Sequence, residues 1–489
     1  MENLASSKLV ALAKILTPKE WKSLAYWLKA PWSKNEPQVL ALYELLSPHY
    51  PGFKAKHLDK ATLYQQLFPQ KAYNNQQLNY LIRKFTEDLQ AFLAHLKLQK
   101  DPAVQQDTLT ELLLERQQIR YFEEAAFNML TTLETKSAKS AEDFLRIFQI
   151  HQALHYQPSS HRRYGKANHH LRKANDALNE FFLLESYRHI SEQSNRSSAL
   201  NQPNFSVPPA LTQYLAHLRK QYISMPAALY EFRLQRTNTD WSTYLEFKQL
   251  FIKTRKQLPR SLQMDFLFMC INETVASVSK GQAGGLRELY QWYQWGIAEN
   301  LLAQHNTITG ITFNNVILTA CHFDDIPLVE QFIKSYQNKL APSLRKDAKR
   351  WATAHLAYVK GDFDTCIGLL EQQLPKQTIY TIQARLTLLK AHFKWVLADK
   401  SQGQRFQYYC LSLEQYFNRN SPYSAERTIA TLRYIQYVKR IAKLSQSFSL
   451  TSKQITSLWT SIDNTPNLFG KAWLQKELQE LKNKIEKGL

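Results

Sequence analysis

Basic and aromatic side chains alternate near the N-terminus of this sequence, at a spacing that places them along a helix. The residues are Lys19, Lys22 and Lys29, with Trp21, Tyr26 and Trp27 beside them. Ammonium groups neutralise phosphates, and aromatic rings can stack on unpaired bases. We therefore take Lys19, Lys22 and Lys29 as candidate contacts for a nucleic acid or an acidic partner.

A second basic and aromatic segment lies near the C-terminus, on one predicted helix. It contains Arg427, Arg433, Lys439, Arg440 and Lys443, interleaved with Tyr434 and Tyr437. Arg433 and Arg440 are seven residues apart and so share a helix face, with Tyr437 between them. The candidate binding residues here are Arg427, Arg433, Tyr437, Arg440 and Lys443. A solvated basic face with tyrosines packed between helices explains the same pattern and is the alternative.

The net charge is concentrated in the same two parts of the chain. The sequence has 62 Lys plus Arg and 41 Asp plus Glu, a formal charge of +21. Residues 1–100 and 401–489 contribute +7 each, 201–300 and 301–400 contribute +4 each, and 101–200 contribute −1. A strongly basic surface attracts polyanions and acidic proteins. The charge therefore predicts an anionic partner.

Signatures of the common enzyme classes are missing from the sequence. We find no GxxxxGK[ST], GxGxxG, HExxH, GxSxG or EF-hand loop. Only 12 of the 489 residues are Gly, where roughly 7% is usual, and glycine lets a backbone wrap around a phosphate. The glycines of Lys280–Gly285 fall between two predicted helices and indicate a helix end and a turn. We expect a protein that is not an enzyme and uses no cofactor.

Histidine and cysteine do not form a recognisable metal or catalytic site. His151 and His155 are one helical turn apart, but no Glu or Cys stands at a complementary position of that helix. The four cysteines are spread widely and form no CxxC pair: Cys270, Cys321, Cys366 and Cys410. We expect no bound metal, and buried, reduced thiols as in a cytoplasmic protein. No uninterrupted apolar stretch of about 18 residues occurs, so we also expect no membrane span.

Apolar residues recur at helical spacing almost throughout the chain, which predicts an all-α fold. We divide the chain into a basic N-terminal helical domain (1–100), a long-helix middle region (101–195), a linker with connecting helices (196–239) and a helical-hairpin solenoid (240–489). The linker prediction depends on Ser194–Pro209, which is polar and contains three prolines.

An internal repeat of 37 residues occurs in the last of these segments. Residues 325–333 align with residues 362–370, so that Asp325 falls on Asp362 and Val329 on Cys366. A helix with small residues precedes each copy, and the aspartate begins the next helix. This pattern is typical of helical hairpins, which bury their apolar faces by stacking on one another.

Residues 351–370 resemble one tetratricopeptide repeat. The shared features are Ala357-Tyr358 at the end of the first helix, Gly361-Asp362-Phe363 in the turn, and the small Cys366 early in the second helix. The whole chain also resembles uncharacterised all-helical bacterial proteins of similar length, through Leu16–Trp21 and Phe68–Tyr73. These resemblances imply hairpins stacked as a tetratricopeptide-like α-solenoid.

Two functions fit these features. The first is a cytoplasmic interaction scaffold that binds a protein or an acidic peptide on its helical surface. The alternative is a nucleic-acid-binding protein, either RNA- or ribosome-associated or DNA-binding, that uses the basic N- and C-terminal helices. The first is our leading expectation because solenoids present extended binding surfaces.

Overall fold

The computed structural model describes residues 3–31, 36–157, 168–200, 206–222, 224–234, 241–279, 281–420, 425–446, 451–466 and 468–486. These residues are almost entirely helical and contain no β-strand, although two isolated bridges join Asn3 to Asp59 and Gln304 to Thr307. The predicted all-α fold is therefore confirmed. No helix in this part of the chain is long and apolar enough to cross a membrane.

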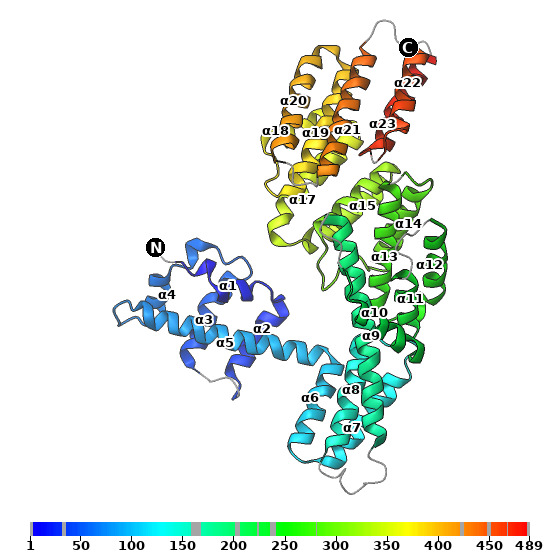
Figure 1. The fold of residues 1–489 in the computed structure, drawn as a ribbon. Helices are drawn as coiled ribbons and strands as arrows, with labels where there is room; N and C mark the ends of the chain where they lie inside the picture. Colours follow the sequence, from blue (N-terminus) through cyan, green and yellow to red (C-terminus); the bar gives the residue numbers. More distant parts are fainter. Residues whose placement is uncertain are drawn as a thin grey trace. The chain divides into compact units, whose positions relative to one another are not determined.

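The chain forms two compact units (Figure 1). The smaller unit comprises Met1–Thr132 and Ala153–Ala167, and the larger comprises Leu133–Gln152 and Asn168–Leu489. These units do not follow the four predicted segments, whose boundaries stay predictions.

The smaller unit begins with short helices that pack on one long helix. Its helices are α1 (Lys8–Ala13), α2 (Pro18–Lys29), α3 (Pro37–Leu46), α4 (Lys60–Leu67), α5 (Asn75–Lys100), α6 (Pro102–Glu115) and α7 (Ile119–Glu134), whose last turn extends past the unit. Short 3-10 turns lie at Leu4–Ser6, Ser47–His49 and Ala55–His57. Helices α1, α2 and α3 each contact α5.

Local sequence signals set where the N-terminal helices begin. Thr17 caps α2 in a capping box with Glu20, and Pro18 occupies the first helical position. The apolar side of α2 then enters the core through Trp21, Leu24 and Leu28. The Trp21 ring stacks on that of Tyr50 with centroids 5.1 Å apart. The opposite side of α2 is left to solvent.

The larger unit contains the remaining helices. They are α8 (Ala141–Tyr156), of which the last turn belongs to the smaller unit, α9 (Asn168–Leu200), α10 (Pro209–Gln221), α11 (Met225–Leu234), α12 (Trp241–Thr254), α13 (Arg260–Ser279), α14 (Gly285–Ala298), α15 (Gly310–His322), α16 (Ile326–Tyr336), α17 (Pro342–Val359), α18 (Phe363–Gln372), α19 (Thr378–Ala398), α20 (Gly403–Asn420), α21 (Ala425–Ser445), α22 (Ser452–Asp463) and α23 (Lys471–Glu486). Further 3-10 turns lie at Arg255–Gln257, Gln337–Lys339 and Lys400–Gln402.

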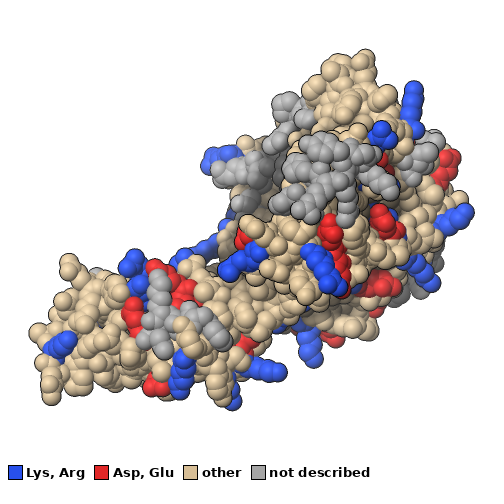
Figure 2. Space-filling view, turned by 90° about the horizontal axis from the view of Figure 1, so that it is seen from below, with Lys and Arg blue, Asp and Glu red and all other residues tan. Residues whose placement is uncertain are grey.

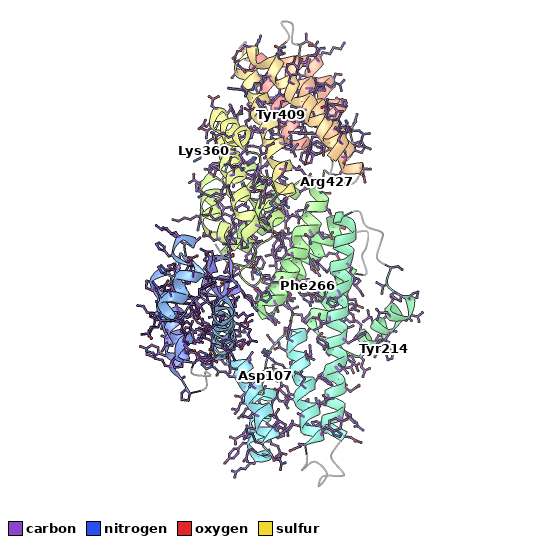
Figure 3. All side chains as sticks on the ribbon, turned by 90° about the vertical axis from the view of Figure 1, so that its left-hand side faces the viewer. Asp107, Tyr214, Phe266, Lys360, Tyr409 and Arg427 are labelled. Carbon is purple, nitrogen blue, oxygen red and sulfur yellow. The ribbon has the colours of Figure 1, made fainter. Side chains whose placement is uncertain are left out.

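Two apolar clusters hold the larger unit together. The first extends from Ala138 to Ala391 and includes Phe266, which is fully buried and labelled in Figure 3. The second joins α19, α20, α21, α22 and α23, and its residues run from Ile382 to Leu481. Tyr409 of α20 lies at the edge of both clusters, where its hydroxyl donates to the carbonyl oxygen of Arg385 at 2.8 Å (Figure 3).

The 37-residue repeat corresponds to two helical hairpins, α15–α16 and α17–α18. Asp325 and Asp362 cap the second helix of each hairpin by accepting the backbone N–H three residues on. The residue before each aspartate is left-handed, with φ of 55° at Asp324 and 82° at Gly361. Val329 and Cys366 are both fully buried. The alignment predicted from sequence thus holds at the level of backbone geometry.

The predicted linker was partly wrong. Helix α9 continues through Ser194 to Leu200, because its backbone hydrogen bonds run past the point where the apolar periodicity stops. Helix α10 begins at Pro209, where proline is compatible with a first helical turn. Residues 201–205 lie outside the described residues.

Candidate functional site

Helix α21 carries the second basic segment and has one buried and one exposed side. Its buried residues are Thr431, Tyr434, Ile435, Tyr437, Val438, Ile441 and Ala442, which pack in the second apolar cluster. Arg433, Gln436, Arg440 and Lys443 are exposed, at intervals of three and four residues. The helical period therefore turns these four side chains to one side of the helix.

A shallow hollow of about 650 Å³ lies against this exposed side. Helix α21 forms one wall, and the turn between α22 and α23 forms the other. The lining residues are Arg433, Gln436, Tyr437, Lys439, Arg440, Asn464, Thr465 and Pro466. We call this hollow the α21 groove. Its described lining contains three cationic side chains and no carboxylate, so its chemistry suits an anion.

Tyr437 fixes the two walls of the α21 groove to each other. Its hydroxyl lies 2.8 Å from Thr465 Oγ1, 3.0 Å from Ser461 Oγ and 3.1 Å from the Ser461 carbonyl oxygen, which accepts from it. Burial alone would raise the pKa of Tyr437. The hydrogen bonds with Ser461 and Thr465 and the charges of Arg440 and Arg433 outweigh burial, so that the pKa is lowered. The ring is 9% exposed and serves as the floor of the groove.

The cations of the α21 groove differ in how far they are neutralised. Lys439 Nζ lies 3.2 Å from Glu414 Oε1 and is held by that ion pair. Arg433 and Arg440 form no ion pair with any residue that the structure describes. The Arg440 guanidinium carbon lies 5.8 Å from the centre of the Tyr437 ring. Two guanidinium groups are therefore presented to solvent about 10 Å apart along the helix.

The structure assembles only part of the candidate set from the C-terminal segment. Arg433, Tyr437 and Arg440 line the groove, whereas Lys443 is exposed one turn beyond it. Arg427 lies in the first turn of α21 and is not among the groove-lining residues. Tyr434 is fully buried against Trp473 and Phe469 and cannot stack on a ligand.

Sequence reasoning missed the second wall of the groove. Asn464, Thr465 and Pro466 belong to a turn whose closeness to α21 depends on how α22 packs. The helix-ending Asn-Thr-Pro could have indicated a turn, but not which surface it meets.

The N-terminal candidates lie together on the exposed side of α2. Lys19, Lys22 and Lys29 are all exposed. Tyr26 lies between the last two and is 79% exposed. Trp21 is buried, and Trp27 packs on α5 with its ring 5.8 Å from Phe92. We call Lys19, Lys22, Tyr26 and Lys29 the α2 face.

Helix α23 contacts α17 and α19 through side chains far apart in the sequence, which no sequence pattern predicted. Trp473 Nε1 donates to the hydroxyl of Tyr358 on α17 at 2.9 Å. Lys394 on α19 forms ion pairs with Glu477 at 2.6 Å and Glu480 at 2.8 Å. Burial lowers the pKa of Lys390, next to Trp473, to about 8. A partner therefore meets an occupied surface here and an open one at the α21 groove.

Cysteine and histidine are placed as structural residues. All four cysteines are buried and form no disulfide in the described part of the chain, and burial raises the pKa of Cys321, Cys366 and Cys410 to about 12. His151 lies with Nδ1 3.0 Å from Nδ1 of His170, and burial together with that neighbour lowers its pKa to about 4. In the described ranges, no three His, Cys, Asp or Glu residues are grouped so that they could hold a metal ion.

Figure 2 shows how charge is distributed over one face of the molecule. Lys and Arg side chains are scattered there and mixed with Asp and Glu, without a continuous basic band. A long polyanion tracked along its whole length would need such a band. On this face, the charge favours contacts confined to small basic sites.

No family model, no curated protein and no solved structure matches this chain.

Proposed function

We propose that this protein is a non-enzymatic, cytoplasmic interaction scaffold that binds an acidic protein or peptide segment in the α21 groove. One observation carries the proposal: Arg433 and Arg440 line a hollow to which none of the described residues contributes a carboxylate. The 37-residue hairpins support a tetratricopeptide-like solenoid as the framework, and four buried cysteines without a disulfide suit a reducing compartment.

The chemistry of the groove fits carboxylates. A guanidinium presents a planar set of donors that can bind a carboxylate through two parallel hydrogen bonds. The amides of Gln436 and Asn464 add neutral donors and acceptors between the two arginines and on the opposite wall. An extended chain with acidic side chains could thus satisfy both guanidinium groups at once.

The proposal is tested by the affinity of the full chain for a labelled acidic peptide. We expect a Glu-rich dodecapeptide to bind, and we expect Arg433→Glu with Arg440→Glu to weaken binding by at least tenfold. A single hydrogen bond to a charged group contributes about 1.5–3 kcal/mol, and each factor of ten is about 1.4 kcal/mol. Fluorescence anisotropy at constant ionic strength measures the change.

The matched control is Lys346→Glu with Lys349→Glu. These lysines are exposed, lie three residues apart on α17 and produce the same change in net charge. If the control weakens binding as much as the groove variant, only net charge matters and the groove is not the site. In cells, affinity purification should recover a stoichiometric protein that survives nuclease treatment. Recovery of nucleic acid alone would contradict the scaffold function.

A further inference from the structure

The α2 face differs from the α21 groove in the one feature that unpaired bases require, an open aromatic ring. Tyr26 is 79% exposed, whereas Tyr437 is 9% exposed. Burying an aromatic ring is favourable, and α2 does bury Trp21 in the core. Tyr26 is the aromatic residue of α2 whose ring surface stays open to a ligand.

Cations surround this ring along the helix. Lys22 precedes Tyr26 by four residues and Lys29 follows it by three, so both flank the ring on the same side of α2. Lys19 extends the row by about another turn. The span from Lys19 to Lys29 is about 15 Å, because a helix rises 1.5 Å per residue.

No acidic side chain opposes these lysines from within α2. The helix has one carboxylate, Glu20, and it is turned to other partners. Lys100 Nζ lies 2.6 Å from Glu20 Oε1, and the Thr17 N–H donates to Oε2 at 2.8 Å. The Lys100 hydrogen bond, followed by the Thr17 N–H, lowers the pKa of Glu20 to about 2. Within the described ranges, Lys19, Lys22 and Lys29 form no ion pair.

We infer that the α2 face binds a short stretch of single-stranded nucleic acid, with one base stacked on Tyr26 and neighbouring phosphates contacting Lys19, Lys22 and Lys29. Open aromatic rings between cations are the general means by which proteins hold single strands without reading sequence. A duplex keeps its bases stacked inside and offers only phosphates. The α2 face should therefore prefer single strands. This inference is independent of the function proposed for the α21 groove.

The test uses the full chain and a labelled twelve-nucleotide oligouridylate. We expect Tyr26→Ala to weaken binding at least about fivefold, since stacking is worth about 1 kcal/mol or more per base. Tyr26→Phe keeps the ring and should bind like the wild type. The matched control is Tyr408→Ala, because Tyr408 is 65% exposed on α20 and lies outside the α2 face. It should leave the affinity unchanged.

Salt dependence supplies a second readout. Three phosphate contacts to a single strand predict that the logarithm of affinity falls with the logarithm of salt concentration with a slope of about −2. Lys22→Gln with Lys29→Gln should reduce the magnitude of this slope to less than about 1. Helical circular dichroism of each variant verifies that the chain remains folded.

Three results would overturn the inference. One is equal affinity of the wild type for the oligouridylate and for a duplex of the same length. Another is an equal effect of Tyr26→Ala and Tyr408→Ala. The third is that Tyr26→Ala abolishes binding to vesicles that contain phosphatidylserine but leaves oligonucleotide binding unchanged. That result would assign the α2 face to a membrane surface. Because Arg433 and Arg440 are unaltered in these variants, acidic-peptide binding can fail or persist independently.

Discussion

The α2 face and the α21 groove use similar residue types in opposite ways. On α2, lysines surround a tyrosine whose ring is open. On α21, arginines line a hollow whose tyrosine is buried as the floor and binds through its hydroxyl to α22. Ammonium groups act as point charges, whereas guanidinium groups present a planar set of donors that can bind a carboxylate or a phosphate through two hydrogen bonds. The difference teaches that a basic helix with aromatic residues does not specify one kind of partner.

The largest difference in stability between the two units should appear when the packing beneath the α21 groove is altered. Gly470 has φ of 65°, and a Cβ there would lie 2.6 Å from the ring of Tyr434, which is fully buried on α21. We expect Gly470→Ala to lower the free energy of unfolding of the larger unit by about 2–4 kcal/mol, from backbone strain and overpacking. Urea unfolding, monitored by hydrogen exchange, measures this free energy.

The same variant tests whether the two sites are independent. Exchange of the α2 amides should be unaltered by Gly470→Ala, since α2 belongs to the smaller unit. Faster exchange in α2 would show that the two units unfold together and would break the comparison. Gly281→Ala, at another left-handed glycine with open space around it, separates backbone strain from the contact with Tyr434.

We expect acidification to cause a smaller difference in stability between the two units. His355 is buried in the larger unit with Nδ1 3.2 Å from Thr387 Oγ1. Burial, with a smaller contribution from Lys390, lowers its pKa from 6.5 to about 3. Below pH 6.5 the His355 imidazole is therefore protonated in the unfolded chain but stays neutral in the folded chain, so the folded state loses stability as the pH falls. The loss from this residue should be about 1.5 kcal/mol between pH 6.5 and 5.

Hydrogen exchange at the two pH values, corrected for intrinsic rates, measures this effect. Amides of α17 should lose protection, whereas those of α2 should not, because none of the described histidines of the smaller unit is buried. His355→Gln should flatten the pH dependence of α17 whatever it does to absolute stability. An unchanged slope in that variant would show that other groups, such as His151, dominate.

The smallest effect comes from removing the same atom at both sites. Tyr437→Phe deletes a hydroxyl that contacts Ser461 and Thr465, and we expect it to cost about 1 kcal/mol of stability. Tyr26→Phe deletes a solvated hydroxyl and should change stability by less than about 0.5 kcal/mol. Urea midpoints of the two variants give the comparison. Equal costs would show that Tyr437 does not join the walls of the α21 groove.

The helical fold and several helix boundaries could be predicted from sequence, because they depend on local signals such as apolar spacing and capping residues. The aligned Asp325 and Asp362 are helix caps three residues from the N–H groups they bind. Residues 194–200, which were expected in a linker, belong to α9, because hydrogen bonds propagate a helix beyond its apolar pattern.

The sequence by itself determined that the chain is helical, that two of its hairpins are related by an offset of 37 residues, and that cations and tyrosines alternate on α2 and α21. It could not determine which tyrosine is open. Tyr437 is buried because α22 packs against α21, through bonds to a residue 24 positions away. Trp473 of α23 donates a hydrogen bond to Tyr358 of α17, a residue 115 positions away in the sequence. Burial and concavity arise from such distant contacts, so only the tertiary structure decided where a partner can bind.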